Sequence, residues 1–313
     1  MAHPASHAHT DAPTHAEPHS HRHDHEQDHS HGHRHGSDGV AEGAMARVLD
    51  LDAELFGGYL TAVTGRLAGL AGGGVTHIVD LGAGTGTGTF ALLERFPGAR
   101  VTAVDSSPAM LAGLERTAQA KGLGSRVSTL EADAGSGLPG ITGADLVWAS
   151  ASLHHLDDPA AALDGIRAAL RPGGLLAVAE MDGMPRFLPD AVVPDRPGLE
   201  ERCRHALSAL HADQVPHLGA DWGALLTAAG LTVEAEHTED LELRAPLPPA
   251  AGEYAHLVLG RVRDALDGRL DPADRSALDA VLNGGALDVR HRDDLTVRST
   301  RWTWTARRPT DRP

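Results

Sequence analysis

The sequence predicts an α/β fold of the doubly wound kind, with a mostly parallel seven-stranded sheet and an antiparallel last strand. Three observations support this prediction. Short apolar, β-rich runs alternate with helical segments between residues 75 and 182, and glycine or proline separates one from the next. Repeated β-α units of this kind form parallel sheets that are covered by helices on both faces. The alternating run at residues 295–304 closes the chain as an antiparallel strand would.

The strands are predicted from apolar and β-branched runs that end at turn residues. The sixth, at residues 232–243, and the seventh follow a long helical stretch rather than the regular alternation. The seven predicted strands are 76–81, 101–104, 127–130, 146–149, 175–180, 232–243 and 295–304.

The helices are predicted from apolar residues at helical spacing and from end signals. Residues 40–70 form one or two helices that stop at a run of three glycines. A helix at 90–96 ends before Pro97. The next has Ser107 as its N-cap and Pro108 at its first position, and another opens at Asp158.

Composition excludes several classes of function. The chain has 313 residues and a formal net charge of -16, which disfavours nucleic acid and anionic membranes as partners. The single cysteine gives no disulfide framework, and no signal segment or spanning stretch of about 18 apolar residues is present. We therefore expect a cytoplasmic protein with a small-molecule substrate, whose oligomeric state the sequence leaves open.

Residues 1–39 differ from the rest of the chain. They hold 12 of the 21 histidines and almost no apolar side chain beyond alanine, so we expect a disordered tail. Clustered imidazoles on a flexible chain can bind divalent metal weakly, without the rigid frame of a catalytic site. We expect no metal site in the folded domain; the tail ligands would be His19, His21, His23, His25, His29, His31, His33 and His35.

The remaining residues, 40–313, are predicted to form one domain. Its core spans about residues 75–182, where the β-α alternation is regular. Segments at about 185–220 and 246–292 have helical patterns outside that alternation, so we expect insertions that form a cap.

A glycine-rich turn at residues 82–88 leaves the first strand and enters a helix. Glycine lets the backbone approach a ligand closely, and the helix N-terminus offers unpaired N–H groups. A phosphate-binding P-loop would need a lysine here, and there is none. The dinucleotide pattern G-x-G-x-x-G fails at its last position, which disfavours hydride transfer. A purely structural bend remains the simpler alternative.

Asp105 lies 23 residues after Gly82, at the end of the second strand. An acidic side chain at this place can accept hydrogen bonds from both hydroxyls of a ribose. The alternative is that Asp105 only caps the helix that begins at Pro108, a task that Ser106 or Ser107 could also perform.

Several motifs in order resemble the class I S-adenosylmethionine (SAM) dependent methyltransferases, of the type that acts on small molecules. They are the sequence DLGAGTG from Asp80 to Gly86, Val104-Asp105, EADA from Glu131 to Ala134, LHHL from Leu153 to Leu156, and LRPGG from Leu170 to Gly174. The resemblance covers roughly residues 75–182; the insertions match nothing that we can place.

The resemblance implies SAM as the cofactor and assigns its contacts. Asp80 would lie near the amino group of the methionine part, and Asp105 would hold the ribose. Asp133 would bind the adenine amino group beside the backbone of Ala134. The other implied contacts are Gly82, Ala83, Gly84 and Gly86 with the methionine part, Ser106 and Met110 with adenine, and Ala149 and Ser150 on the sulfonium side.

Such an enzyme transfers a methyl group by in-line attack on the SAM methyl, so the protein mainly has to hold donor and acceptor in line and exclude water. A base helps when the nucleophile carries a proton. His154 and His155 are the candidate catalytic residues, with Glu180 and His217 as further possible bases. The alternative for the histidine pair is a packing role.

Two further alternatives stay open. Phe56 and Tyr59 either cover the cofactor or belong to the core. In a different class of function, the chain would be a metal-handling or sensing protein that uses the histidine-rich tail, with a SAM-binding domain that does not turn over.

Overall fold

The computed structural model describes residues 34–136, 138, 140–194 and 196–310. The predicted α/β class is confirmed. A seven-stranded sheet has the order β3-β2-β1-β4-β5-β7-β6. All pairs from β3 to β5 are parallel, and β7 is antiparallel to both β5 and β6. The strands are β1 (His77–Leu81), β2 (Arg100–Asp105), β3 (Val127–Glu131), β4 (Ala144–Ser150), β5 (Leu170–Met181), β6 (Thr232–Leu243) and β7 (Val297–Arg307).

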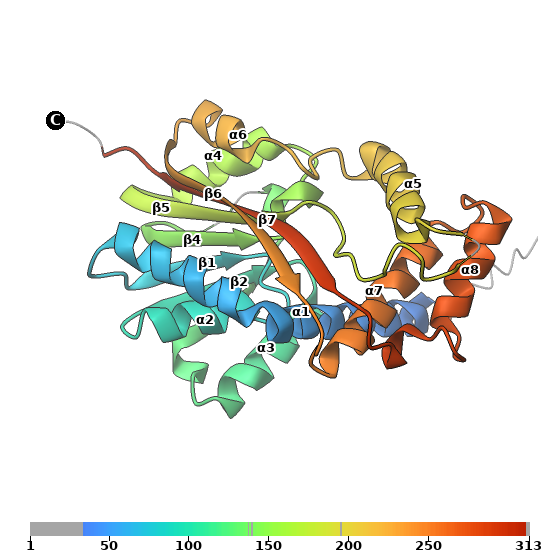
Figure 1. Cartoon of the computed structure of the whole chain (residues 1–313). Coiled ribbons are helices and arrows are strands. Elements are labelled where there is room, and N and C mark those ends of the chain that lie inside the picture. The colour runs from blue at the N-terminus through green and yellow to red at the C-terminus, as the bar shows by residue number, and fades with distance from the viewer. Residues whose placement is uncertain (1–33, 137, 139, 195, 311–313) are drawn as a thin grey trace, which may run out of the picture.

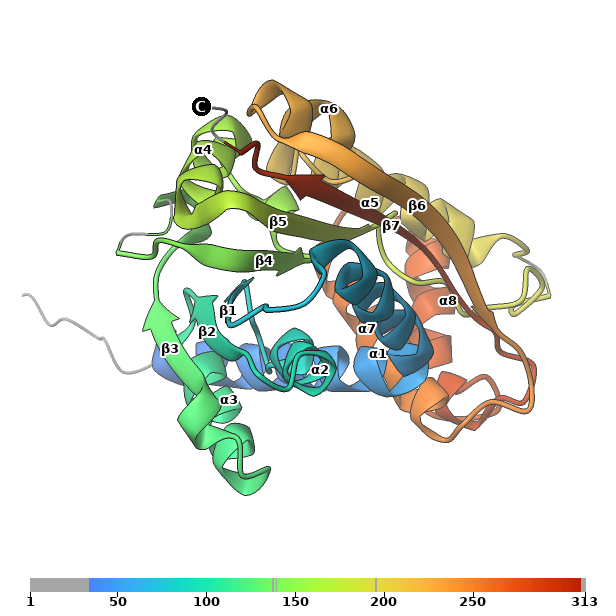
Figure 2. The same cartoon turned by 90° about the vertical axis from the view of Figure 1, so that its left-hand side faces the viewer.

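Helices cover both faces of the sheet, as Figures 1 and 2 show. On one face α1 and α2 bury Val63, Leu67 and Leu92 against the strands. On the other, α4 and α6 bury Leu163 and Trp222 in a second cluster. The helices are α1 (Arg34–Ala71), α2 (Thr87–Arg95), α3 (Pro108–Ala120), α4 (Pro159–Ala169), α5 (Leu199–Gln214), α6 (Trp222–Ala228), α7 (Ala250–Ala265) and α8 (Pro272–Leu282).

The segment α1 consists of two helices joined at a kink, in line with the prediction of one or two helices. The kink lies at Phe56, whose backbone is not helical (φ -113°, ψ 23°). The segment begins at Arg34, so residues 34–39, which were expected to belong to the disordered tail, are helical. Extending a formed helix costs little per residue, which lets it continue past the apolar pattern. The rest of the predicted tail, with all its named histidines except His35, lies outside the described residues.

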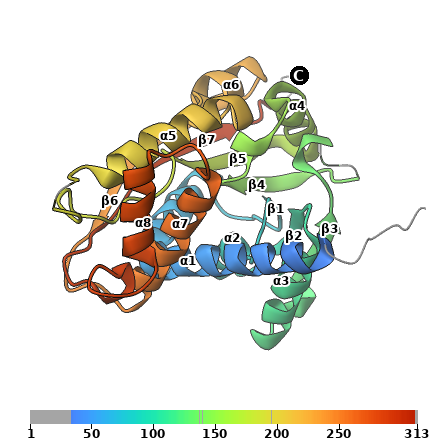
Figure 3. The same cartoon turned by 90° about the vertical axis from the view of Figure 1, so that its right-hand side faces the viewer.

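The inserted helices α5, α7 and α8 pack beyond the carboxyl ends of the parallel strands (Figures 1 and 3). A buried carboxylate connects α5 and α8: Asp274 of α8 accepts hydrogen bonds from Arg202 of α5 and from Arg196, which precedes α5. The cap therefore stands over the edge of the sheet where the order of strands reverses between β1 and β4. In open α/β sheets this edge is the usual place for a ligand.

No described helix combines the length and the apolar character needed to cross a membrane. The described residues also contain no group of three or more His, Cys, Asp or Glu side chains placed to hold a metal ion.

Candidate functional site

A cavity of about 340 Å³ lies between the glycine-rich turn and the cap. Its walls come from α1, the turn after β1, the ends of β4 and β5, and from α5, α7 and β7. Of the predicted site residues, the ones that line it are Asp80, Gly82, Ala83, Gly84, Ser150, His154 and His155.

The glycine-rich turn lines the cavity, and at two of its positions a side chain would be strained. Gly82 has φ +71°, and a Cβ there would lie 2.5 Å from Cβ of Ser152. Gly84 has φ +51°, and a Cβ would meet Leu49 of α1 at 3.0 Å. L-residues avoid this left-handed region, so both positions need glycine. The turn thus presents bare backbone to the cavity.

Asp80 ends β1 beneath this turn and is almost fully buried. The hydroxyl of Thr89 donates a hydrogen bond of 2.5 Å to Oδ2 of Asp80. Burial raises the pKa of Asp80 to about 6, although the bond from Thr89 opposes this shift. A cationic group placed beside Asp80 would recover the energy that burial of its charge costs.

Asp105 is tied directly to the glycine-rich turn. Its Oδ2 accepts a hydrogen bond of 2.9 Å from the backbone N–H of Gly84, and its Oδ1 accepts one of 2.9 Å from Ser107. The hydroxyl of Ser107 accepts a hydrogen bond from Met110 N and so caps α3. Asp105 is therefore not the N-cap residue of this helix. The hydroxyl of Ser107 donates to Glu42 of α1 at 2.7 Å. This helix therefore lies against the end of β2.

The other predicted contacts lie outside the lining of the cavity. Asp133 is exposed, and its Oδ1 accepts a hydrogen bond of 2.8 Å from Gly135 N. Ala149 is fully buried behind Ser150, and Gly86 faces Leu114. The predicted residues that do not line the cavity are Gly86, Asp105, Ser106, Met110, Asp133, Ala134 and Ala149.

His154 and Glu180 form a buried pair at the cavity wall. Nδ1 of His154 lies 2.6 Å from Oε2 of Glu180, and Oε1 of Glu180 accepts a hydrogen bond from Leu153 N at 3.1 Å. A carboxylate on Nδ1 fixes the orientation of the imidazole and leaves Nε2 free for a ligand. Glu180 thus holds the imidazole of His154 in place. His217, the other possible base, does not line the cavity.

Two further histidines lie close to this pair. The rings of His154 and His155 are 4.1 Å apart, and His211 approaches from α5 of the cap. Burial lowers the pKa of His155 and the pKa of His211, and the charge of His154 adds to both effects. The neutral forms of His155 and His211 are therefore favoured at neutral pH.

A buried cluster in the cavity wall was not predicted from the sequence. Arg301 of β7 donates to Oδ1 of Asp52 of α1 at 2.5 Å, and the hydroxyl of Tyr254 donates to the same oxygen at 2.7 Å. The guanidinium of Arg301 lies over the rings of Phe56 and Tyr59. Of the residues in and around this cluster, the sequence analysis identified only the aromatic Phe56 and Tyr59 as candidates. Phe56 and Tyr59 are buried core residues, as one of the two predicted alternatives has it, and they also line the cavity.

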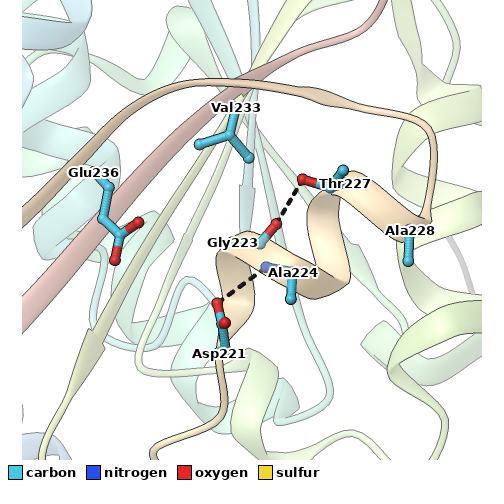
Figure 4. Close-up of a pocket in the computed structure, with 7 residues that line it drawn as sticks. All are labelled: Asp221, Gly223, Ala224, Thr227, Ala228, Val233 and Glu236. Carbon is cyan, nitrogen blue, oxygen red and sulfur yellow. Dashed lines mark hydrogen bonds between the residues drawn. The ribbon is translucent and has the colours of Figure 1, made fainter.

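A second hollow lies on the outer surface between α6 and β6 (Figure 4). Its polar side chains serve the helix itself, since Asp221 accepts a hydrogen bond from Ala224 N at 3.0 Å and Thr227 donates to Gly223 O at 2.8 Å. None of the motifs found in the sequence reaches it. We therefore assign the candidate site to the cavity beneath the cap.

The fold, the glycine-rich turn and the acidic strand ends together resemble those of class I SAM-dependent methyltransferases. Residues 79–176 match a family model described as "Methyltransferase domain". This match confirms, over these residues, the resemblance seen in the sequence.

Two curated relatives and one solved structure are similar to this chain. Trans-aconitate 2-methyltransferase of Paracidovorax citrulli is 34% identical over 52% of this chain and 60% of the relative. The enzyme of the same name from Enterobacter sp. strain 638 is 35% identical over 50% of this chain and 60% of the relative. The chain thus spans about three fifths of the length of these relatives. A Bacillus halodurans structure described as a candidate methyltransferase has a TM-score of 0.50 at 16% identity, covering 79% of this chain and 99% of that one; it supports the fold alone.

The residues present fit SAM as a cofactor. The glycine-rich turn presents Gly82, Ala83 and Gly84 to the cavity without a bulky side chain. Asp80 is a buried carboxylate without a cationic partner among the described residues. An ammonium group such as that of the methionine part would supply one.

Proposed function

We propose that the chain is a SAM-dependent methyltransferase that acts on a small-molecule acceptor. One observation carries the proposal: the glycine-rich turn, Asp80, His154 and residues of the cap all line one cavity. A site of this shape can hold a donor and an acceptor side by side and keep water away from both. We propose residues 34–313 as one domain, with the cap formed by α5, α7 and α8.

SAM supplies a methyl group already activated on a sulfonium, so the chain needs no group of its own to activate it. We assign Gly82, Ala83 and Gly84 to the methionine part, and Asp80 to its amino group. Asp105 is assigned to the ribose, which lies next to the turn that it orients. The remaining predicted cofactor contacts, now as proposals, are Gly86, Ser106, Met110, Asp133, Ala134, Ala149 and Ser150.

His154 is the best-placed base. Its Nδ1 is held by Glu180, so Nε2 is the nitrogen that can take a proton from an acceptor. His155 lies against it without a carboxylate partner among the described residues. We therefore assign proton transfer to His154 and a contact with the acceptor to His155.

The test is calorimetric titration with SAM. Wild-type protein should bind, and Asp105→Ala should weaken binding at least about tenfold, because it removes an acceptor for the ribose and loosens the turn at Gly84. Exposed Asp164→Ala is a matched control that should bind as wild type does. Unchanged binding in Asp105→Ala would refute the assignment.

Turnover is tested with SAM that carries a labelled methyl group and a panel of metabolites. The relatives bear the name trans-aconitate 2-methyltransferase, so trans-aconitate is the first acceptor to assay. Retained label in SAM with every acceptor, despite tight cofactor binding, would favour a binding protein without turnover.

A further inference from the structure

Trp148 of β4 lies in the wall of the cavity, and neither the sequence motifs nor the proposed function gives it a role. It is 1% exposed, and the little surface that it keeps belongs to the cavity lining. In the sheet it is the register partner of Asp80 on the neighbouring strand β1. Register partners carry their side chains on the same face of a sheet, so the indole lies beside the buried carboxylate of Asp80.

Gly88, the second residue of α2, lets the indole approach this carboxylate closely. A Cβ at this position would lie 2.6 Å from Nε1 of Trp148 and 3.2 Å from Oδ2 of Asp80. The backbone of Gly88 is helical, so the need for glycine here comes from the nearby indole and not from a strained conformation. Nε1 of Trp148 and Oδ2 of Asp80 thus meet at the start of α2.

The N–H of Trp148 is an unused donor. An indole nitrogen can donate a hydrogen bond but cannot accept one. Among the described residues no acceptor takes this N–H, and Oδ2 of Asp80 accepts from the hydroxyl of Thr89 instead. The unpartnered indole nitrogens of Trp222 and Trp304 are sealed in the protein, whereas that of Trp148 is not. It approaches Gly88 and Asp80, which both line the cavity, so a ligand there can accept from it.

The first turn of α2 adds backbone donors at the same place. This helix has nine residues, its N-cap residue Gly86 makes no side-chain hydrogen bond, and its first turn contains no acidic side chain. The N–H groups of Thr87 and Gly88 therefore have no partner among the described residues, and both residues line the cavity. The positive end of the helix dipole favours an anionic group in front of these donors.

Groups that prefer opposite charges thus stand side by side. The three N–H donors suit an anion, whereas the carboxylate of Asp80 suits a cation and has no cationic partner among the described residues. A lone anion would be repelled by Asp80. A ligand that carries an ammonium and a carboxylate on one carbon atom satisfies both requirements, and the amino-acid part of SAM is such a group.

We propose that Nε1 of Trp148, together with the N–H groups of Thr87 and Gly88, binds the carboxylate of the amino-acid part of SAM. The inference rests on the proposed function, because it extends the cofactor site to a group that Asp80 and the glycine-rich turn leave unbound. Hydrogen bonds to a charged acceptor are about twice as strong as those between neutral groups, and the enclosed site strengthens them further.

The test compares SAM with decarboxylated SAM, which keeps the sulfonium and the amino group but lacks the carboxylate. Both are titrated calorimetrically into wild-type protein and Trp148→Phe, which keeps an aromatic ring and removes the donor. Trp148→Phe should weaken binding of SAM about 10- to 100-fold and binding of decarboxylated SAM by less than about threefold. Trp222→Phe is the matched control: its indole nitrogen is also buried and unpartnered but lies outside the cavity lining, so both affinities should stay at the wild-type level.

Gly88→Ala is a second variant that keeps the indole and pushes it away from α2. It should also weaken SAM binding more than binding of decarboxylated SAM. Melting temperatures without ligand show whether each variant is folded, and Gly88→Ala carries the test if Trp148→Phe does not fold.

Two results would overturn the inference and leave the proposed function standing. One is wild-type affinity for SAM in Trp148→Phe. The other is an equal loss of affinity for SAM and decarboxylated SAM in both variants, which would give Trp148 a packing role only. If wild-type protein binds neither compound, the proposed function and this inference are both refuted.

Discussion

At the scale of single residues, buried ionisable groups give the cavity its character. Asp80 is the carboxylate under the turn, Glu180 holds His154, and Asp52 neutralises Arg301. Asp80 and Glu180 are enclosed by protein, where charge interactions are stronger than in water. The protonation of Asp80 should therefore be visible in binding measurements.

The affinity for SAM should depend on pH through Asp80. Its pKa is about 6 instead of 3.8, because burial penalises the charged form. Below about pH 6 the carboxyl is mostly protonated and attracts an ammonium poorly. The dissociation constant should thus fall about tenfold between pH 5 and pH 7, below the range of about pH 7.7–8.0 in which the α-ammonium group of SAM itself loses its proton.

Asp80→Asn supplies the control for this pH dependence. Calorimetry should show weaker binding that no longer changes over the same range, since an amide does not titrate there. A variant that keeps the wild-type slope would show that another group is responsible.

Removing the base should slow turnover without harming the cofactor site. We expect His154→Gln to lower kcat about 100-fold or more, the usual contribution of a positioned base, with the SAM dissociation constant changed less than about twofold. Glu180→Gln should also lower kcat, because an amide stabilises a protonated imidazole less than a carboxylate does. Labelled-methyl assays measure both.

His217→Gln is the matched control, because His217 does not line the cavity. It should keep the wild-type rate. Equal rate losses in His217→Gln and His154→Gln would contradict the assignment.

Some site residues could be found from the sequence and others could not, for a physical reason. The turn, Asp105 and the histidine pair lie within short motifs whose spacing reflects local backbone geometry. Asp52, Tyr254 and Arg301 come from three elements, and Asp52 and Arg301 are 249 positions apart. Only the folded chain brings them together.

At the scale of elements, the sequence located strands better than helix ends. Strand runs are bounded by glycine or proline, so β1 to β4 begin and end within about two residues of prediction. The helix α6 was missed, because its seven residues are too few to show a period. The start of α1 was misplaced, because no N-cap motif marks it.

The cap should be stabilised by its buried ion pairs. Asp274→Asn breaks charge-assisted bonds from Arg196 and Arg202, so it should lower the free energy of unfolding by about 2 kcal/mol. The two arginines lower the pKa of Asp274 to about 2 from 3.8. A lowered acid pKa stabilises the fold fully above pH 3.8, and this contribution is lost as the pH falls toward 2.

Urea unfolding at several pH values measures this difference. Asp271→Asn is the control: its carboxylate also contacts Arg196 but is exposed, so it should cost less than about 0.5 kcal/mol. The difference in unfolding free energy between wild type and Asp274→Asn should shrink below pH 3. A difference that stays constant there would contradict the proposed link between the pKa of Asp274 and stability.

At the scale of the whole molecule, α1 belongs to the catalytic unit rather than to the tail. Glu42 contacts Ser107, Leu49 covers Gly84, and Asp52 binds Arg301. Removal of residues 1–33 should therefore leave SAM affinity and turnover unchanged. Removal of residues 1–58 takes all three contacts away and should abolish cofactor binding.

The two truncations also bear on the metal-handling alternative, which depends on histidines of the tail. Calorimetry with SAM and a methyl-transfer assay check both chains. Loss of turnover in the shorter truncation would give the tail a role that the folded domain does not explain.

The bond between Asp52 and Arg301 places a constraint on biosynthesis. The ribosome makes Asp52 early and Arg301 249 residues later, so at about 5–20 residues per second the partners are separated by roughly 12 to 50 seconds. During that interval the first helix lacks this anchor, and nascent chains stalled before residue 297 should not retain SAM. Cofactor capture would then mark a finished polypeptide.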